Sequence, residues 1–437
     1  MSYLLRCRAA VHIRSPIWHQ STRFKSTLTS YSGSVVNNKS YRVLFFGETP
    51  YSLEVLKALN DWRLSDNTMI DSISVVCPKS IWTGLKRRVL VRESLVDTFA
   101  KENTLGSSWV NNNNEMQSWS IPEGWPKFDI AVVAGCRWRL PKSLENKFSE
   151  GVVSVHPSLL PKHRGPTPVI SAMLSDSRET GVTVCEYSFD RVDSGNILAQ
   201  LPYTIEKGYT REDVLRDLGY LGGKLLVKSI ENIDHLKKHA VRQNMYEANY
   251  SRYYDNDDEV RVIWETMGAD EIVKLNEAFH GKRATHTIFR KKDIMAKVFL
   301  YDMHVADKST EPLDAEFLKY PPGSIFYKRK VPYLEVPCID GKRLHITRLG
   351  REGRPIMTGL QYVNGYLRLS GALRFLSYPV EPVKPTPKFQ YPPGYVKPTL
   401  MDVYSPAESQ ELLAVSKKVK ASDRNKIKQL IESMCDE

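Results

Sequence analysis

The chain has 437 residues, more than one typical domain, and its length predicts two or three folded units. Charged residues make up 26% and hydrophobic residues 41%, which is a globular composition, and no apolar run approaches the roughly 18 residues of a membrane-spanning helix. We therefore expect no membrane segment. The net charge of +12 favours a polyanionic partner such as nucleic acid or an anionic membrane surface, although a basic targeting segment would also raise it.

The first 40 residues are basic, rich in serine and free of acidic residues, because the first carboxylate is Glu48. This composition predicts a mitochondrial transit segment over residues 1–40, and hence a protein of the matrix. The alternative is a basic arm that binds RNA directly. The basic residues of the segment are Arg6, Arg8, Arg14, Arg23, Lys25 and Lys39.

Strands and helices alternate in the first half of the chain. Residues 41–46 predict a buried strand and residues 52–59 a helix with a serine N-cap. Further strands are expected at 73–76 and 129–134, with a helix over 90–101 between them. This order indicates an α/β fold with a parallel sheet. The later elements are a loop at 111–114, strands at 151–156 and 181–188, and helices at 168–174 and 210–233, the last with Thr210 as its N-cap.

After residue 239 the pattern changes, and strand-like segments follow one another without helices between them. A small β-barrel is the expected fold. The predicted division is a transit segment at 1–40, an α/β domain at 41–238, a linker at 239–258, a barrel at 259–377 and a proline-rich, basic helical tail at 378–437. Within the barrel a short helix is expected at 270–279 and strands at 294–305, 324–327, 333–336 and 344–349.

The six cysteines lie far apart and form no C-x-x-C pair. Neither a zinc site nor a disulfide framework is expected from this spacing, so we predict free thiols and no metal.

Three short motifs carry the chemistry. The first runs from Ser154 through His156 to Gly165, the second is Thr180-Gly181-Val182-Thr183, and the third contains Asp193 and Gly195. A lone histidine at the end of a strand, or a lone aspartate in a turn, is more often structural. Together they are expected to meet at the carboxyl edge of the sheet, where open α/β sheets bind their ligands.

These motifs resemble the formyltransferase family that uses 10-formyl-tetrahydrofolate, whose pattern is Asn-x-His-x-Ser-Leu-Leu-Pro-x-x-Arg-Gly, then Thr-Gly-Val-Thr, then Asp-x-Gly. The resemblance covers about residues 41–367, and residues 262–264, 322–325 and 364–367 are similar to the carboxy-terminal domain of methionyl-tRNA formyltransferases. It implies a Rossmann-like domain with a parallel-rich sheet, followed by a small OB-like barrel. The implied reaction formylates the amino group of methionine on initiator tRNA and supports mitochondrial translation initiation.

The resemblance also implies roles for single residues. His156 accepts a proton and lies beside the oxyanion, and Asp193 orients His156 and favours its imidazolium form. Ser154 stands where the family has asparagine, and a serine hydroxyl is a shorter donor to the oxyanion. The folate co-substrate is expected at the segment 131–141 and at the loop after His156. The residues assigned to it are Gly135, Leu140, Pro141, Ser158, Leu159, Leu160 and Pro161.

A basic loop with an aromatic residue, Trp82, follows the strand at 73–76, and it resembles the insertion with which methionyl-tRNA formyltransferases grip the acceptor stem. The predicted tRNA-binding residues are Lys79, Lys86, Arg87 and Arg88. A second cluster, Lys282, Arg283, Arg290, Lys291 and Lys292, is equally compatible with a solvated face. Two other functions stay open: a formyltransferase for a small amine, and a non-catalytic RNA-binding relative. We expect a monomer.

Overall fold

The computed structural model describes residues 39–83, 89–92, 94–291, 294–306, 319–328, 331–367 and 374–377. The predicted transit segment, apart from its last two residues, and the predicted tail at 378–437 lie outside these ranges. Within them, no helix combines the length and the apolar character that a membrane crossing requires.

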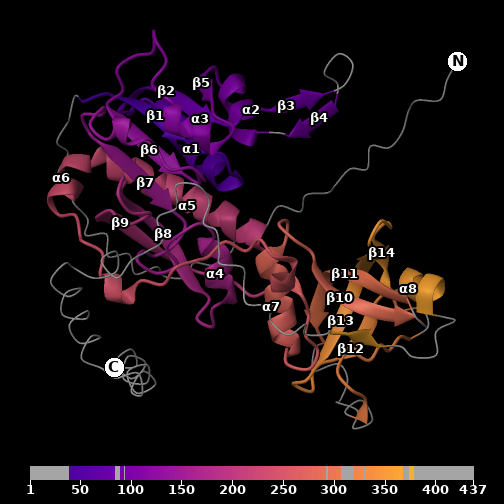
Figure 1. Ribbon diagram of the computed structural model, residues 1–437. Helices are drawn as coiled ribbons and strands as arrows, with labels where there is room; N and C mark the ends of the chain where they lie inside the picture. Colours follow the sequence, from indigo (N-terminus) through magenta and orange to yellow (C-terminus); the bar gives the residue numbers. More distant parts are fainter. Residues whose placement is uncertain are drawn as a thin grey trace, which may run out of the picture. The chain divides into compact units, whose positions relative to one another are not determined.

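The first sheet has seven strands in the order β5-β2-β1-β6-β7-β8-β9 (Figure 1). The five strands from β5 to β7 are parallel, and β8 and β9 continue the sheet in antiparallel fashion. The predicted parallel-rich α/β fold is therefore confirmed. The bounds are β1 Tyr41–Phe46, β2 Ile70–Cys77, β5 Gly106–Trp109, β6 Ile130–Ala134, β7 Val152–His156, β8 Glu179–Glu186 and β9 Ile197–Thr204.

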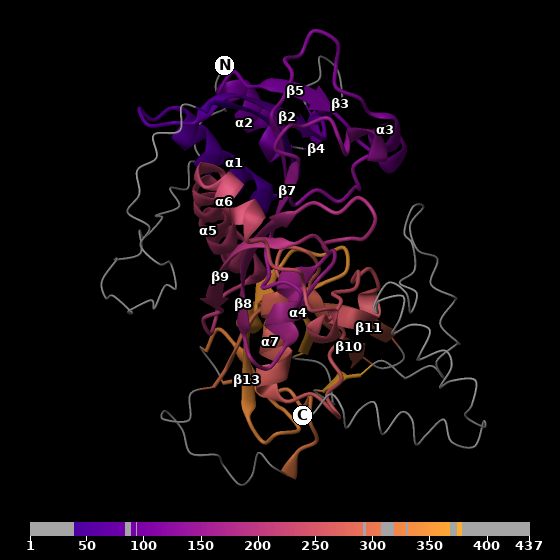
Figure 2. The same ribbon diagram turned by 90° about the vertical axis from the view of Figure 1, so that its left-hand side faces the viewer.

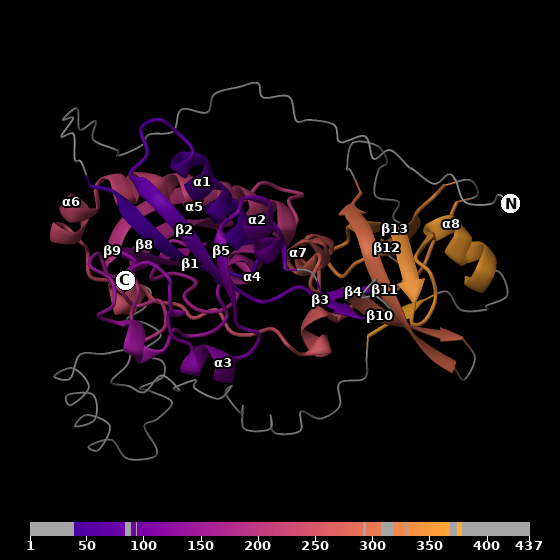
Figure 3. The same ribbon diagram turned by 90° about the horizontal axis from the view of Figure 1, so that it is seen from above.

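Both faces of this sheet are buried. In β1, Val43 and Phe45 belong to one apolar core, and Leu44 and Phe46 belong to another. The helices α1 and α5 lie side by side over the first core (Figure 2), and α3 lies on the opposite face (Figure 3). The bounds are α1 Pro50–Arg63, α2 Leu95–Glu102, α3 Asn113–Ser118, α4 Pro168–Leu174, α5 Arg211–Glu231 and α6 Ile233–Lys238, with short 3-10 turns η2 Lys142–Leu144, η3 Met245–Glu247 and η4 Asp257–Val260.

Some local expectations were wrong. The helix α1 is capped by Thr49, whose side chain and that of Ser52 form a reciprocal capping box, rather than by a serine. The expected helix at 90–101 begins only at Leu95, because the apolar residues before it form a hairpin of β3 (Ile81–Thr83) and β4 (Val89–Arg92). The expected loop at 111–114 contains the start of α3, whose N-cap is Asn112.

The second sheet is antiparallel and has the order β12-β13-β11-β10-β15, with β14 beside β13. Its two edges are joined through one segment: Phe326 pairs with Glu335 of β12, and Ser324 pairs with Arg374, which precedes β15. These bridges curl the sheet into the predicted barrel. The bounds are β10 Thr285–Lys291, β11 Ile294–Val305, β12 Leu334–Pro337, β13 Arg343–Arg351, β14 Met357–Thr358 and β15 Phe375–Leu376, with helices α7 Ala269–Phe279 and α8 Gly359–Tyr362 and the π-helix η6 Val363–Leu367.

The helix α7 contributes to two cores. Leu275, Ala278 and Phe279 belong to the core under α1 and α5, whereas Ala269 and Ile272 belong to the core of the barrel. The expected helix at 270–279 is confirmed, and it serves both sheets.

Candidate active site

The strand β7 carries the central residues of the site at its carboxyl end. Its side chains alternate, so Val153 and Val155 enter the core under α1 and α5 while Ser154 and His156 point to the other face. His156 is only 5% exposed, and its Nε2 atom is buried without a hydrogen-bond partner among the described residues. A buried ring nitrogen that no neighbour uses is available to a substrate proton.

Asp193 lies in a turn between β8 and β9, and it reaches His156 across the sheet edge. The distance from Asp193 Oδ2 to His156 Nε2 is 3.7 Å. This is longer than a direct hydrogen bond, so the expected bond between the two is replaced by a close electrostatic contact. The backbone N–H of Gly165 donates to the same Oδ2 at 3.2 Å and fixes its position. The three predicted motifs therefore meet at one edge.

The turn that presents Asp193 is tightly packed. Asp193 itself adopts a left-handed backbone with φ of 50°. A Cβ atom at Gly195 would overlap the carbonyl oxygen of Glu186, so only glycine fits there. The third motif thus has a structural basis: an aspartate aimed at His156 and a glycine that lets the turn approach β8.

Burial and charge act on His156 in opposite directions. Burial lowers the pKa of His156, because the imidazolium form loses its hydration, and the carboxylate of Asp193 raises the same pKa. Burial is the larger effect. His156 is consequently a neutral base at neutral pH, with Asp193 placed to stabilise the charge once a proton arrives.

The loop after His156 is held by hydrogen bonds to β8 and β9. The Leu160 N–H donates to Thr183 Oγ1 at 3.0 Å, and the Thr183 hydroxyl donates to the Ser158 carbonyl at 2.7 Å. Gln200 donates to the Leu160 carbonyl at 2.7 Å. The Ser158 side chain is fully buried and donates to the Lys162 carbonyl, so it shapes the loop from within. Pro161 follows a cis peptide bond.

The segment after β6 forms the neighbouring wall. Gly135 has φ of 55°, and a Cβ there would overlap Thr49 Oγ1 at the start of α1. The Leu140 N–H donates to the Tyr187 hydroxyl at 3.0 Å, and Leu140 and Pro141 are buried. The backbone of this segment is therefore fixed in place by α1 and by the end of β8.

Ser154 lies on β7 between Val133 of β6 and Cys185 of β8. It is 7% exposed, and its hydroxyl makes no hydrogen bond to a described residue. An uncommitted hydroxyl on the face of β7 that carries His156 can donate to an oxygen held there.

The predicted tRNA-binding residues are only partly described. Lys79 is exposed and its Nζ lies 4.4 Å from the centroid of the Trp109 ring, which is a cation–π contact. Lys86, Arg87 and Arg88 lie outside the described residues. In the second cluster Arg283 is already paired with Asp257 at 2.9 Å, and Lys292 lies outside the described residues.

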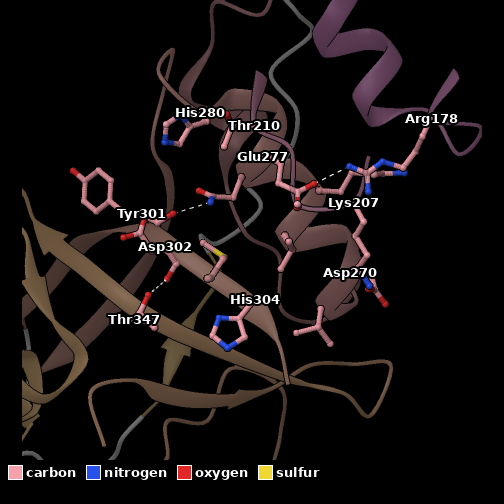
Figure 4. Close-up of a pocket in the computed structure, with 16 residues that line it drawn as sticks. Arg178, Lys207, Thr210, Asp270, Glu277, His280, Tyr301, Asp302, His304 and Thr347 are labelled. Atoms are coloured by element: carbon pink, nitrogen blue, oxygen red, sulfur yellow. Dashed lines mark hydrogen bonds and ion pairs between the residues drawn. The ribbon is translucent and has the colours of Figure 1, made fainter. Parts of the chain in front are cut away.

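A separate pocket of about 540 Å³ lies away from His156, between α7, β11 and residues 207–210 (Figure 4). Its lining carries both signs of charge and includes the ion pair of Arg178 with Glu277 at 2.9 Å. The described part of the chain contains no group of three or more side chains suited to hold a metal ion.

Sequence comparison places this geometry in a family. Residues 41–230 match the model of the formyl transferase domain, and residues 256–367 match the model of the formyl transferase carboxy-terminal domain. A methionyl-tRNA formyltransferase of Anaeromyxobacter dehalogenans is 30% identical over 240 residues, which are 55% of this chain and 72% of the relative. The chain belongs to the formyl transferase family. It is therefore an enzyme of the transferase class.

Another relative in the formyl transferase family is the human mitochondrial methionyl-tRNA formyltransferase, which is 28% identical over 329 residues, 75% of this chain and 78% of that protein. Among solved structures, HypX from Aquifex aeolicus in complex with tetrahydrofolic acid aligns with a TM-score of 0.49 at 14% identity. The alignment covers 78% of this chain and 51% of HypX.

The sequence does not predict one group of site residues. Gln243 and residues 249–251 lie in the polar segment expected to be a linker, and they hydrogen-bond to the two loops that contain Asp193 and Gly165. Nothing in the local sequence marks them, because their contacts lie 48 to 87 residues away along the chain.

Proposed function

We propose that this formyl transferase moves the formyl group of 10-formyl-tetrahydrofolate to the amino group of methionine on initiator tRNA. The observation that carries the proposal is the free, buried Nε2 of His156 facing Asp193, at the edge of the sheet where the three motifs meet. The mitochondrial relatives that bear this name support it, since they match 75% to 84% of the chain.

His156 would remove the proton that the methionine amine loses when it bonds to the formyl carbon. Because burial keeps His156 neutral, its Nε2 can accept this proton at neutral pH. The folate supplies the formyl group on nitrogen, already activated for transfer. Asp193 would stabilise the imidazolium that forms, and His156 would return the proton to the departing folate nitrogen.

Ser154 would donate its hydroxyl hydrogen to the formyl oxygen as negative charge builds up on it. Its hydroxyl is uncommitted and lies two residues before His156 on the same face of β7. A donor aimed at developing charge acts mainly in the transition state.

The loop after His156 and the segment after β6 flank the carboxyl edge of the sheet, and they suit a flat, mostly apolar ligand with a few polar groups. Leu140, Leu160 and Pro161 are buried apolar residues. Gly135 has no side chain, so its backbone can lie close to this edge of the sheet. We assign the folate to these two segments, with Pro141, Ser158 and Leu159 shaping them. For the tRNA we assign Lys79, Lys86, Arg87 and Arg88, which come before β3 or between β3 and β4 in the sequence.

The test is formyl transfer with defined acceptors. The purified chain is incubated with labelled 10-formyl-tetrahydrofolate and, in parallel, with charged initiator tRNA, uncharged tRNA and a nucleotide-linked amino sugar. We expect labelled formyl-methionine only from charged initiator tRNA. Formylation of the amino sugar alone would identify a small-amine enzyme, and folate binding without transfer to any acceptor would indicate a non-catalytic relative.

We further propose that the protein is a monomer in the mitochondrial matrix. We also propose that its domains have the boundaries predicted from the sequence. The basic, acid-free residues 1–40 and the mitochondrial relatives support the location. Import of the labelled full chain into isolated mitochondria, with protection from added protease, tests it. A chain that stays outside, with residues 1–40 intact, would contradict it.

A further inference from the structure

Residues 239–258, expected to be a simple linker, are bound to both loops of the active site. Val241 pairs with Ile197, just after the Asp193 turn, through two backbone hydrogen bonds of 2.8 and 2.9 Å. Farther along, the Arg164 N–H donates to the Asn249 carbonyl at 3.0 Å, and the Ser251 N–H donates to the Arg164 carbonyl at 2.7 Å. This segment is therefore a wall of the site rather than a tether.

Gln243 is the side chain through which this wall reaches Asp193. It is 5% exposed, and its Nε2 donates to the carbonyl oxygens of Asp193 at 2.9 Å and of Gly195 at 2.8 Å. Both partners are acceptors, so the amide nitrogen must face them. In the flipped orientation the amide oxygen would face the two carbonyl oxygens and be repelled by them. One amide group thus joins the two ends of the turn Asp193-Ser194-Gly195.

The turn needs such a clamp. A left-handed backbone at a residue other than glycine costs on the order of 1 kcal/mol, and it persists only where the surroundings hold it. In Asp193 this backbone directs the carboxylate towards His156, where only 3.7 Å separates the charged oxygen from Nε2. A small relaxation of the turn would increase that distance.

We propose that Gln243 is a positioning residue for formyl transfer: it holds the Asp193 turn so that the carboxylate stays within reach of His156. The inference rests on the proposed function, because it assigns Gln243 a part in that reaction. Gln243 acts through Asp193 and contacts neither the formyl group nor the amine.

The proposal has an electrostatic signature. Asp193 is the charged group that acts on His156 among the described residues, and it raises the pKa that burial lowers. If the carboxylate moves away, the pKa of His156 falls further. Three other titratable groups near Asp193 do not change their charge in the pH range in which His156 titrates. Burial raises the pKa of Cys185 and of Tyr253, and raises that of Tyr187 to about 12, so all three stay protonated through neutral pH.

The first experiment measures formyl transfer by Gln243→Met in the full chain, since methionine keeps the shape and removes both donors. We expect kcat to fall about tenfold to a hundredfold, with KM for folate and for charged tRNA changed less than about twofold. The acid limb of the pH–rate profile should move to lower pH, in the same direction as in Asp193→Asn. Asn276→Leu is the matched control, because it also removes an amide donor to a backbone carbonyl, that of Tyr301, but in the barrel. It should leave kcat and the acid limb unchanged.

The second experiment needs no activity. The titration of the His156 imidazole is followed by NMR, with His156→Ala used to assign the signal, and its midpoint should be lower in Gln243→Met than in the starting chain. A lower midpoint in a chain that formylates no acceptor would support the positioning role while defeating the proposed function. An unchanged midpoint and an unchanged acid limb would overturn the positioning role, even if activity falls, because a structural defect reduces activity equally at every pH.

Discussion

His156 in the first sheet and Glu335 in the second are both buried titratable residues, and their surroundings differ. Glu335, whose side chain is 5% exposed, has two cationic side chains within 4 Å, Arg343 at 3.7 Å and Lys328 at 3.9 Å, and the His345 ring at 3.7 Å. Among the described residues, His156 faces the single carboxylate of Asp193, and its Nε2 has no hydrogen-bond partner.

The difference separates two uses of a buried charge. Removing a charge from water costs several kcal/mol, and the barrel offsets this cost by surrounding Glu335 with opposite charge. At His156 the single carboxylate of Asp193 only partly offsets the effect of burial, and His156 therefore stays neutral and able to accept a proton. Changes at the two sites should accordingly affect different properties, catalysis in one and stability in the other.

The largest effect on transfer is expected from the catalytic pair. His156→Ala and Asp193→Asn should each lower kcat by about a hundredfold or more, the scale of general acid–base catalysis, with little change in tRNA affinity. Single-turnover assays with charged tRNA, beside a tRNA-binding measurement, check this. Near-normal turnover in either variant would show that His156 and Asp193, like Glu335, serve stability rather than catalysis.

The pH dependence of formyl transfer tests the roles of His156 and Asp193 separately. Neutral His156 is the active form, so activity should fall as the pH drops through its pKa. Burial places that fall below the ordinary histidine value of about 6.5. In Asp193→Asn the raising effect of the carboxylate is lost, so the acid limb should move lower still. A shift to higher pH would contradict the assigned roles.

Ser154→Ala should have a smaller effect on transfer, about tenfold on kcat, with folate affinity nearly unchanged, because the hydroxyl acts on charge that develops in the transition state. Ser154→Asn restores the residue of the family pattern and should be active. Rapid-quench measurement of the chemical step tests both. Full activity in Ser154→Ala would make Ser154 a packing residue of β7.

Replacing Lys86, Arg87 and Arg88 by alanine should weaken tRNA binding and leave the chemical step intact. About three phosphate contacts would be lost, so the plot of log affinity against log salt should be shallower by roughly two to three units. Lys282, Arg283 and Arg290 are the matched set in the barrel. Their replacement should change the slope less, since Arg283 is already paired with Asp257. Equal changes of the salt slope for both sets would show that the first set has no special part in tRNA binding.

Glu335→Gln should not change kcat of the folded enzyme, but it should lower the free energy of unfolding by about 3 kcal/mol, because the buried Arg343 loses its counter-charge. Asp302→Asn in the same barrel is the control. Its ion pair with Arg348 at 3.3 Å is about half exposed on both sides, so it should cost at most about 1 kcal/mol. Denaturant titration compares them, and equal losses would show that the charges around Glu335 give no special stability.

The sequence predicted those parts of the fold that depend on nearby residues. Thr210 caps α5, and Pro168 begins α4, because capping and helix initiation are local. The direction of β8 and the strand β9 did not follow from the pattern, since alternation reveals a strand but not its partner. The pattern predicts a helix from residue 90, where the structure has the strand β4, because Leu90 and Val91 fit either structure.

The candidate site divides in the same way. Ser154, His156 and Asp193 were predictable because they belong to motifs of fixed spacing, and the structure brings their elements to one edge. Gln243 was not predictable, because it acts through backbone carbonyls that any residue could supply. The separation of 3.7 Å between Asp193 and His156 is equally a property of packing that no spacing reveals.

The helix α7 links the folding of the two sheets. Its residues Leu275, Ala278 and Phe279 complete one core, and Ala269 and Ile272 complete the other. Neither core can be exposed without disturbing this helix, so the backbone amides of α7 should exchange with solvent only through global opening. Heating should then produce one cooperative transition rather than two, and separating the barrel from the catalytic sheet would leave each with an open apolar face.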